Sequence, residues 1–341
     1  MMQRVGQTLL LLLLLLLASC QGDEPAGGES NRLVIYSGRS ESLVQPLIDQ
    51  FAADSGLDVD VRYGGTAELA AALLEEGENS PADLFYAQDP GGLGAVEAAG
   101  LLAPLPRERL EQVNPFFVPD SAAWVGISGR ARVIVYNSTL LTESDLPADI
   151  AGFTDPQWRG RIGWAPTNGS FQAMVTAMRA IWGAAETRAW LAGIQANDPV
   201  VYSGNTPIVE GVASGEVDVG FVNHYYLFRF LSEQGESFPA RNYFLPGGGP
   251  GSLLMVSGAG ILRSAENEAN AQRFIDYLLS ETGQQYFSDE TFEYPVIAGV
   301  AADEMLVPLP ALIDLAATVS LTELADLQGT QDLLLDLGII E

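Results

Sequence analysis

Two neighbouring tyrosines, Tyr225 and Tyr226, are the residues of this chain whose type and spacing best suit chemistry. They follow an apolar stretch, 216–222, that we predict to be a buried strand, and they precede an amphipathic stretch that we predict to be a helix. Adjacent side chains on a regular strand point to opposite faces, so two tyrosines converge only where the backbone leaves the strand. The sequence therefore predicts two phenol oxygens at the carboxyl end of a strand, where α/β proteins usually bind their ligands.

Two converging phenols suit a hard trivalent cation such as Fe³⁺. Hard cations prefer oxygen ligands and stabilise the phenolate, although the ordinary pKa of the phenol is about 10. The same pair could instead be aromatic core residues or an aromatic face for a sugar or an amine. From the pair alone, these plainer interpretations are favoured over a metal site. His224, the only histidine of the chain, precedes the pair. Its direct contact with a metal is the less favoured alternative.

The amino-terminal residues predict export and a lipid anchor. Arg4 precedes a leucine-rich run, 9–17, and small residues follow, which is the order of a secretory signal. The ending Leu-Ala-Ser-Cys resembles a bacterial lipobox, and Cys20 is the only cysteine, so we expect a lipidated Cys20 and no disulfide. We predict a signal peptide over 1–19 and a lipidated cysteine with a flexible tether over 20–31. The expected location is extracytoplasmic, at the cell surface or in the periplasm, with the membrane contacted through the lipid only.

The charge of the chain excludes several classes of function. All 16 basic residues are arginines, and 44 acidic residues give a net charge of −28. A polyanion is repelled by nucleic acid and by anionic lipid headgroups. The lack of lysine excludes Schiff-base and P-loop chemistry. An acidic surface is also common in proteins adapted to salt, so the charge does not by itself identify a cationic ligand. The 48% of apolar residues is enough for substantial cores and suggests about two domains.

Short apolar stretches alternate with amphipathic ones in two separate series, which predicts two α/β units with parallel strands covered by helices. Two longer, glycine-interrupted stretches, 124–137 and 252–262, are β-rich and are predicted to connect the units. Their glycines could serve as a hinge or could be plain bulges. The predicted strands are 33–36, 59–61, 83–86, 161–164 and 200–202, and the predicted helices are 43–55, 66–76, 171–182 and 208–214.

Six segments of the chain resemble the ferric-iron-binding proteins of bacterial ABC importers, in the same order over nearly all of the mature chain. The resemblance implies an α/β fold of the type II periplasmic-binding class, a two-lobed clamshell with two hinge strands. Lobe 1 is then predicted over 32–128 plus 258–298, lobe 2 over 129–257, and C-terminal helices that pack on the lobes over 299–341. The six segments are 34–39, 80–86, 128–136, 161–167, 223–226 and 318–339.

The resemblance also implies metal ligands. The adjacent iron-binding tyrosines of the family match Tyr225 and Tyr226, and a third tyrosine ligand of some members matches Tyr136. A histidine and a glutamate that many members use are missing, because their positions hold Ser40 and Gln88. This pattern resembles the subgroup in which three tyrosines bind iron and an anion completes the ligand set.

We therefore predict Fe³⁺ together with a synergistic anion, carbonate or phosphate, as the bound species. Three phenolates would neutralise Fe³⁺, so the charge of the anion has to be offset by donors from the protein. Guanidinium groups bind oxyanions bidentately, and the free N–H groups at the start of a helix form a ready anion site. The anion-binding residues that we predict are Arg39, Arg130, Thr167, Asn168, Gly169, Asn205 and Asn223.

The expected function is that of a monomeric lipoprotein that captures Fe³⁺ between two lobes and delivers it to an ABC permease and its ATPase, without bond-making chemistry. One alternative keeps the fold and changes the ligand to a polyamine, sugar, phosphonate or thiamine-type molecule. An extracellular hydrolase is less favoured, because Glu41 and Asp89 are the only obvious acids of the cleft-forming segments and no Gly-x-Ser-x-Gly motif is present. Direct contact of His224, Gln88 or Asp89 with the metal stays open, as do the identity of the anion and the preference for Fe³⁺ over Fe²⁺.

Overall fold

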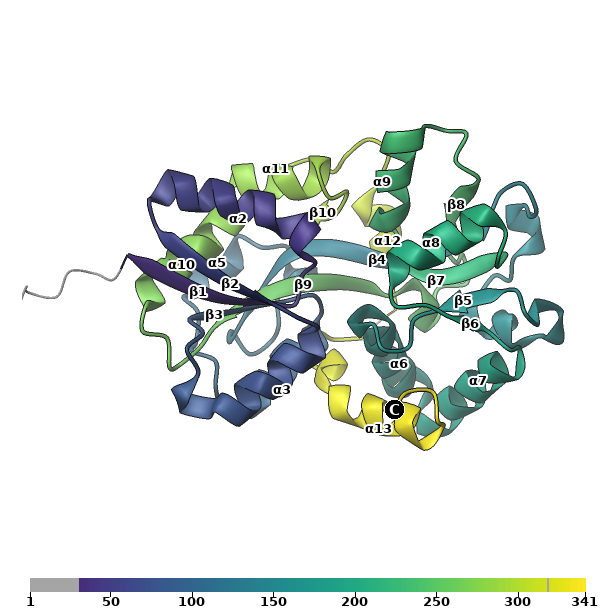
Figure 1. The fold of residues 1–341 in the computed structure, drawn as a ribbon, viewed down its shortest axis with the longest axis horizontal. Helices are drawn as coiled ribbons and strands as arrows, with labels where there is room; N and C mark the ends of the chain where they lie inside the picture. Colours follow the sequence, from purple (N-terminus) through teal and green to yellow (C-terminus); the bar gives the residue numbers. More distant parts are fainter. Residues whose placement is uncertain (1–30, 318) are drawn as a thin grey trace, which may run out of the picture. The chain divides into compact units, whose positions relative to one another are not determined.

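A mixed sheet of ten strands organises residues 31–317 and 319–341, which are the residues that the computed structural model describes (Figure 1). The main path of the sheet is β2-β1-β3-β9-β4-β7-β5-β6, and β8 and β10 pair with β4 beside that path. The predicted signal peptide, Cys20 and, apart from Asn31, the predicted tether lie outside the described residues.

Three parallel strands form one end of the sheet: β1 (Arg32–Ser37) pairs with β2 (Asp58–Tyr63) on one side and with β3 (Leu84–Ala87) on the other. The helix predicted at 66–76 is α3 (Thr66–Glu76), and its bounds agree with the prediction. In Figure 1, α2 and α10 lie on one face of these strands and α3 on the other, and the Phe51 and Phe274 rings of α2 and α10 are 5.0 Å apart. The further helices at this end are α2 (Glu41–Ser55), α4 (Pro90–Ala98), α5 (Arg107–Glu111), α10 (Glu268–Leu278) and α11 (Glu281–Asp289).

A second group of strands forms the other end of the sheet. β5 (Ile162–Trp164) pairs in parallel with β6 (Val200–Val201) and with β7 (Val219–Asn223). These strands are buried apart from the edge strand β6, which explains why their sequences are short apolar runs. In Figure 1, α8 and α9 lie on one face of this group and α6 and α7 on the other. The remaining elements here are β8 (Ala240–Tyr243), α6 (Gly169–Trp182), α7 (Ala184–Ala196), α8 (Asn205–Ser214) and α9 (Tyr225–Gln234).

One long strand, β4 (Val125–Asn137), joins the two groups. Its first half pairs with β9 (Leu254–Ile261) as far as Ala131, and from Arg132 onward it pairs with β7 instead. β4 therefore passes from one group to the other between Ala131 and Arg132. Both predicted connecting stretches are strands, and the fold is the expected two-lobed α/β clamshell with two hinge strands. The exact limits of the two lobes stay a prediction.

Close packing explains the glycines of these two strands. A Cβ on Gly126 would collide with the backbone carbonyl of Phe117, and a Cβ on Gly258 would lie 2.7 Å from the ring of Trp124. The register between β4 and β9 also shifts between Gly126 and Ser128. The bulge that the sequence left open is therefore present in β4 at Gly126, and tight packing excludes a side chain at both Gly126 and Gly258.

The C-terminal segment packs on elements from both ends of the sheet. The Thr330 and Thr176 hydroxyls, on α13 (Leu327–Asp336) and α6, are 2.7 Å apart. Ala325 of the preceding short 3₁₀ helix lies against α4, where a Cβ on Gly94 would collide with it. The other elements of this part are β10 (Tyr294–Pro295), which pairs with β4, and α12 (Leu309–Leu315). Within residues 31–317 and 319–341, no helix has both the length and the apolar character needed to cross a membrane.

Candidate metal centre

Tyr225 and Tyr226 are the first two residues of α9, one residue after the end of β7. Both side chains are buried, and their rings are stacked with centroids 4.3 Å apart. Gln88 Nε2 donates a hydrogen bond of 3.4 Å to the Tyr225 hydroxyl. Burial, assisted by the neighbouring Tyr225, raises the pKa of Tyr226 well above that of a free phenol. A cation bound by these phenols therefore has to displace phenol protons.

A cavity of about 470 Å³ opens beside Tyr226. One of its walls comes from the loops that follow β1, β2 and β3, and the other comes largely from the start of α6. Ser40 and Gln88, at the positions for which the resemblance implies a histidine and a glutamate in many members, both line it. Four of the predicted anion-binding residues line this cavity: Arg39, Thr167, Asn168 and Gly169. Gln88 and Asp89, whose contact with the metal the sequence left open, line it as well.

Arg130 and Arg132, two residues apart on β4, are both buried next to the tyrosine pair. Arg132 Nη1 donates to the side-chain oxygens of Asn205 (3.3 Å) and Asn223 (3.1 Å). Among the described residues, Arg132 Nε and Nη2 and all three guanidinium nitrogens of Arg130 lack a hydrogen-bond acceptor. Burial lowers the pKa of Arg130, and it lowers the pKa of Arg132 to about 9. Buried guanidinium donors without acceptors fit a bound anion. Arg132 is a site residue that the sequence analysis missed.

Two buried carboxylates partly offset this positive charge. Arg39 donates a hydrogen bond to Glu293, and Arg130 Nη1 lies 3.9 Å from the same carboxylate. Burial disfavours the charge of Arg39, but Glu293 together with the phenols of Tyr86, Tyr225 and Tyr226 outweighs it, so the pKa of Arg39 is raised. Asp89 is also buried; burial raises its pKa, and Arg130 acts in the opposite direction. Three arginines against two carboxylates, 3 − 2, leave one positive charge around the tyrosines.

The two asparagines connect the end of β7 to the start of α6. Asn205 Oδ1 accepts a hydrogen bond from the Asn223 backbone N–H (3.0 Å), and Asn223 Nδ2 donates to Ser170 Oγ (3.0 Å). Asn168 caps α6 by accepting from the Ser170 backbone N–H (3.1 Å). The start of α6, Asn205 and Asn223 are thus brought together, as the resemblance implies. A Cβ on Gly169 would collide with the Asp89 carboxylate, so a larger residue there would require Asp89 to move.

The structure places Tyr136 at the other end of β7 from the tyrosine pair, and it does not support the prediction that Tyr136 is a third metal ligand. Tyr136 pairs with Val219 at the amino end of β7, whereas Tyr225 follows the carboxyl end, where Asn223 pairs with Arg132. Four residues of extended strand separate the two positions, which is about 13 Å. Burial raises the pKa of Tyr136, and the charged groups that act on it are Glu143 and Arg241, away from the cavity. The position of Tyr136 depends on the register of two antiparallel strands, and similarity along the sequence does not reveal that register.

Both ring nitrogens of His224 form hydrogen bonds with backbone groups. Its Nδ1 accepts a hydrogen bond from the Ala131 N–H (3.1 Å), and its Nε2 lies 2.9 Å from the Phe292 carbonyl oxygen. Because a carbonyl only accepts, the proton is on Nε2. Burial lowers the pKa of His224 to about 3, so the ring is neutral. Neither nitrogen is free for a metal, which answers the question that the sequence left open.

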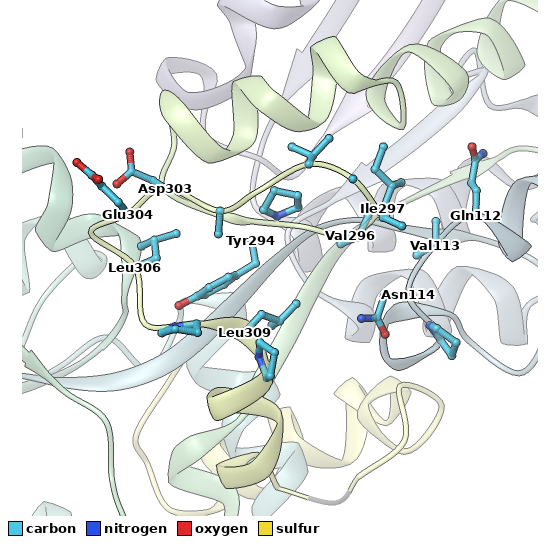
Figure 2. A pocket seen from close by; sticks show the side chains of 18 of the residues that line it. Gln112, Val113, Asn114, Tyr294, Val296, Ile297, Asp303, Glu304, Leu306 and Leu309 are labelled. Atoms are coloured by element: carbon cyan, nitrogen blue, oxygen red, sulfur yellow. The ribbon is translucent and has the colours of Figure 1, made fainter.

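A larger cavity, of about 790 Å³, lies elsewhere in the molecule (Figure 2). Figure 2 shows Tyr294, Leu306 and Leu309 among its lining side chains, with Asp303 and Glu304 at one side. It contains none of the predicted metal or anion residues. In the described part of the chain, no group of three or more His, Cys, Asp or Glu residues is placed to hold a metal ion.

The fold and the buried cleft between its two groups of strands define a two-lobed solute-binding protein. A comparison with protein families agrees: residues 46–314 match the family described as bacterial extracellular solute-binding protein. This chain belongs to that family.

Several proteins are similar to this chain over most of its length. The Fe(3+)-binding periplasmic protein of Serratia marcescens is 36% identical over 289 residues, which cover 84% of this chain and 85% of the relative. The major ferric iron-binding protein of Neisseria meningitidis is 33% identical over 310 residues, 90% of this chain and 93% of the relative. Among solved structures, iron-bound HitA from Pseudomonas aeruginosa superposes with a TM-score of 0.85 at 34% identity, over 90% of this chain and 99% of its own.

Proposed function

We propose that this protein captures ferric iron together with an anion in the cleft and delivers it to an ABC permease. The observation that carries the proposal is the stacked, buried pair of Tyr225 and Tyr226 beside buried guanidinium groups that lack acceptors within residues 31–317 and 319–341. Phenolates are hard oxygen donors, and unsatisfied guanidinium N–H groups are oxyanion donors. The naming of the relatives as ferric iron-binding proteins supports the same cargo.

The number of protein donors explains why an anion is needed. A hard cation takes about six oxygen ligands, and without Tyr136 the tyrosines supply two. Ser40 and Gln88 replace the two further ligands that the resemblance implies for many family members. The remaining positions on the iron are therefore filled by oxygens of the anion and by water. The anion is held in turn by Arg39, Arg130 and Arg132, with Asn205, Asn223 and the start of α6 around it.

The charge of the site favours a polyanion. Fe³⁺ bound to two phenolates has a charge of 3 − 2, or +1, and the arginines and carboxylates around the pair contribute one further positive charge. Carbonate and phosphate carry charge of the sign and size that offsets this excess. The anion therefore completes the ligands of the metal and balances the charge of the buried arginines at the same time.

Attachment and delivery complete the proposal. A lipid on Cys20 would hold the mature protein at the outer face of the cell membrane, as the lipobox resemblance implies. The permease and its ATPase are the partners of solute-binding proteins of importers, and the bound metal would be released to them. Closure of the two lobes around iron and anion requires no catalytic residue.

The test is an absorbance spectrum of the purified mature protein before and after addition of Fe³⁺-citrate with bicarbonate. We expect a visible phenolate-to-iron charge-transfer band, and we expect the band to be lost in Tyr225→Phe. Folding of the variant is checked by circular dichroism. A folded wild-type protein that shows no band and no iron-dependent rise in melting temperature would contradict the proposal and favour an organic ligand in the same cleft.

A further inference from the structure

His224 connects the segments of the chain that carry the candidate site. Its backbone N–H donates to the Ala131 carbonyl (3.0 Å), and its own carbonyl accepts from Asn242 Nδ2 (2.8 Å). Its ring accepts from the Ala131 N–H and donates to the Phe292 carbonyl. All four of its polar groups are therefore engaged, and they hold the start of α9 to β4, to β8 and to the segment before β10.

The bonds to Ala131 join the residue that precedes the two phenols to the residue that lies between two guanidinium groups. Ala131 lies between Arg130 and Arg132, where β4 leaves β9 and begins to pair with β7. His224 exchanges a hydrogen bond in each direction with this one residue, through its backbone N–H and through Nδ1. Because Tyr225 and Tyr226 directly follow His224, the same residue fixes the metal donors and the anion donors relative to each other.

The bond to Phe292 extends this control to the carboxylate of the site. Phe292 has φ of +55°, a conformation that bulky residues rarely adopt. Its carbonyl accepts from His224 Nε2, and the next residue, Glu293, accepts a hydrogen bond from Arg39. The His224 ring is also stacked on the Tyr294 ring, with centroids 5.0 Å apart and planes at 29°. Tyr294 in turn lines the larger cavity (Figure 2).

We propose that His224 is a positioning residue for iron capture: through its two ring hydrogen bonds it holds the phenols of α9, the arginines of β4 and Glu293 in one arrangement. It does not touch the metal. This inference rests on the proposed function, since it concerns the geometry of that site. Residues that orient metal ligands without binding the metal change metal affinity by about 10–100-fold when they are replaced.

The test compares His224→Phe with His224→Gln in the mature protein. Phenylalanine keeps the ring that stacks on Tyr294 but removes both ring hydrogen bonds, whereas the glutamine amide can accept from Ala131 and donate to Phe292. We expect His224→Phe to bind Fe³⁺ with bicarbonate about tenfold or more weakly and to shift the charge-transfer band. We expect His224→Gln to restore most of the affinity and the wild-type band position.

Tyr294→Phe is the matched control for a merely structural role. It keeps the stacked ring and removes the hydroxyl that donates to the Val307 carbonyl (2.7 Å), so it should lower the melting temperature without changing the band or the affinity. If His224→Phe does not fold, His224→Asn replaces it, because the shorter amide cannot reach both partners. Unchanged affinity and band in a folded His224→Phe, or equal affinities of the Gln and Asn variants, would overturn the inference. If the wild-type protein itself does not bind iron, that result would instead contradict the proposed function.

Discussion

The surface and the interior of this protein carry opposite charge. The chain has 44 acidic residues against 16 arginines, and the arginines that lie outside the cleft are typically paired with exposed carboxylates, as Arg188 is with Asp336. Around the tyrosine pair the balance is reversed, because Arg39, Arg130 and Arg132 are at most 2% exposed and outnumber Asp89 and Glu293. A strongly negative chain thus encloses a positive site.

This difference shows that net charge and local charge answer different questions. The net charge describes how the molecule behaves toward other large charged surfaces, whereas ligand binding depends on the few groups that are removed from water. A charge buried without a partner is costly, and guanidinium groups such as that of Arg130 are satisfied only when an anion or phenolates come close. The cationic interior is therefore tied to the ligand, and the acidic exterior is not.

The largest expected effect comes from removing a proposed metal donor of the interior. Tyr225→Phe or Tyr226→Phe deletes a phenolate and leaves the arginines and the acidic surface intact. Because loss of a direct ligand exceeds the effect of an orienting residue, we expect iron affinity to fall more than about 100-fold. Titration of the charge-transfer band measures this. Iron affinity that is unchanged in both variants would remove the tyrosines from the site.

Lowering the pH should weaken iron binding almost as strongly. Burial raises the pKa of Tyr226, so its phenol is protonated at neutral pH and loses the proton only when iron binds. If both phenols lose protons, affinity should fall by up to about 100-fold for each pH unit below neutrality. Iron titrations between pH 6 and pH 8, about one unit to each side of neutrality, measure the slope. A flat profile would mean that the phenols do not become phenolates.

Replacing an interior arginine and replacing a surface arginine should have clearly different effects on iron affinity. Arg132→Met removes a buried donor of the proposed anion site, and Arg188→Met removes an arginine that is 45% exposed and pairs with a 69% exposed Asp336. We expect about a tenfold loss of iron affinity in the first variant, the cost of one charge-assisted hydrogen bond, and none in the second. Titrations at several bicarbonate concentrations should show weaker anion dependence in Arg132→Met. Equal behaviour of the two variants would remove Arg132 from the anion site.

The smallest effect is expected for Tyr136→Phe. This tyrosine lies at the amino end of β7, about 13 Å along the strand from the end that carries the pair. Its hydroxyl should therefore contribute nothing to iron binding, and the charge-transfer band and affinity should match the wild type. A loss comparable to that of Tyr225→Phe would show that the two ends of β7 act together.

Much of the fold could be predicted from local patterns. The helix over 66–76 has the predicted bounds, and the strands predicted at 33–36 and 59–61 lie within β1 and β2. Asn168, predicted in the segment that opens a helix, is the N-cap of α6. Apolar spacing and capping act over a few residues, so they can be recognised without knowing the tertiary structure. The helix α7 (Ala184–Ala196) was not among the predicted elements.

The site was predicted only in part, because its residues are far apart in the sequence. Glu293 reaches Arg39 across more than 250 positions, and nothing near either residue indicates the pair. Arg132 could have been found, since it shares with Arg130 the face of β4 given by the two-residue period. Tyr136 shares that period as well, and only the register with β7 shows that it lies at the wrong end.

By itself, the sequence determined the elements, the tyrosine pair at a strand-to-helix junction and the acidic composition, because each depends on residue type and short spacing. The tertiary structure alone decided which tyrosines meet, which arginines are buried without acceptors, and that His224 is bound to two backbone segments instead of a metal. These features depend on strand register and burial, which arise when distant segments pack together and water is excluded.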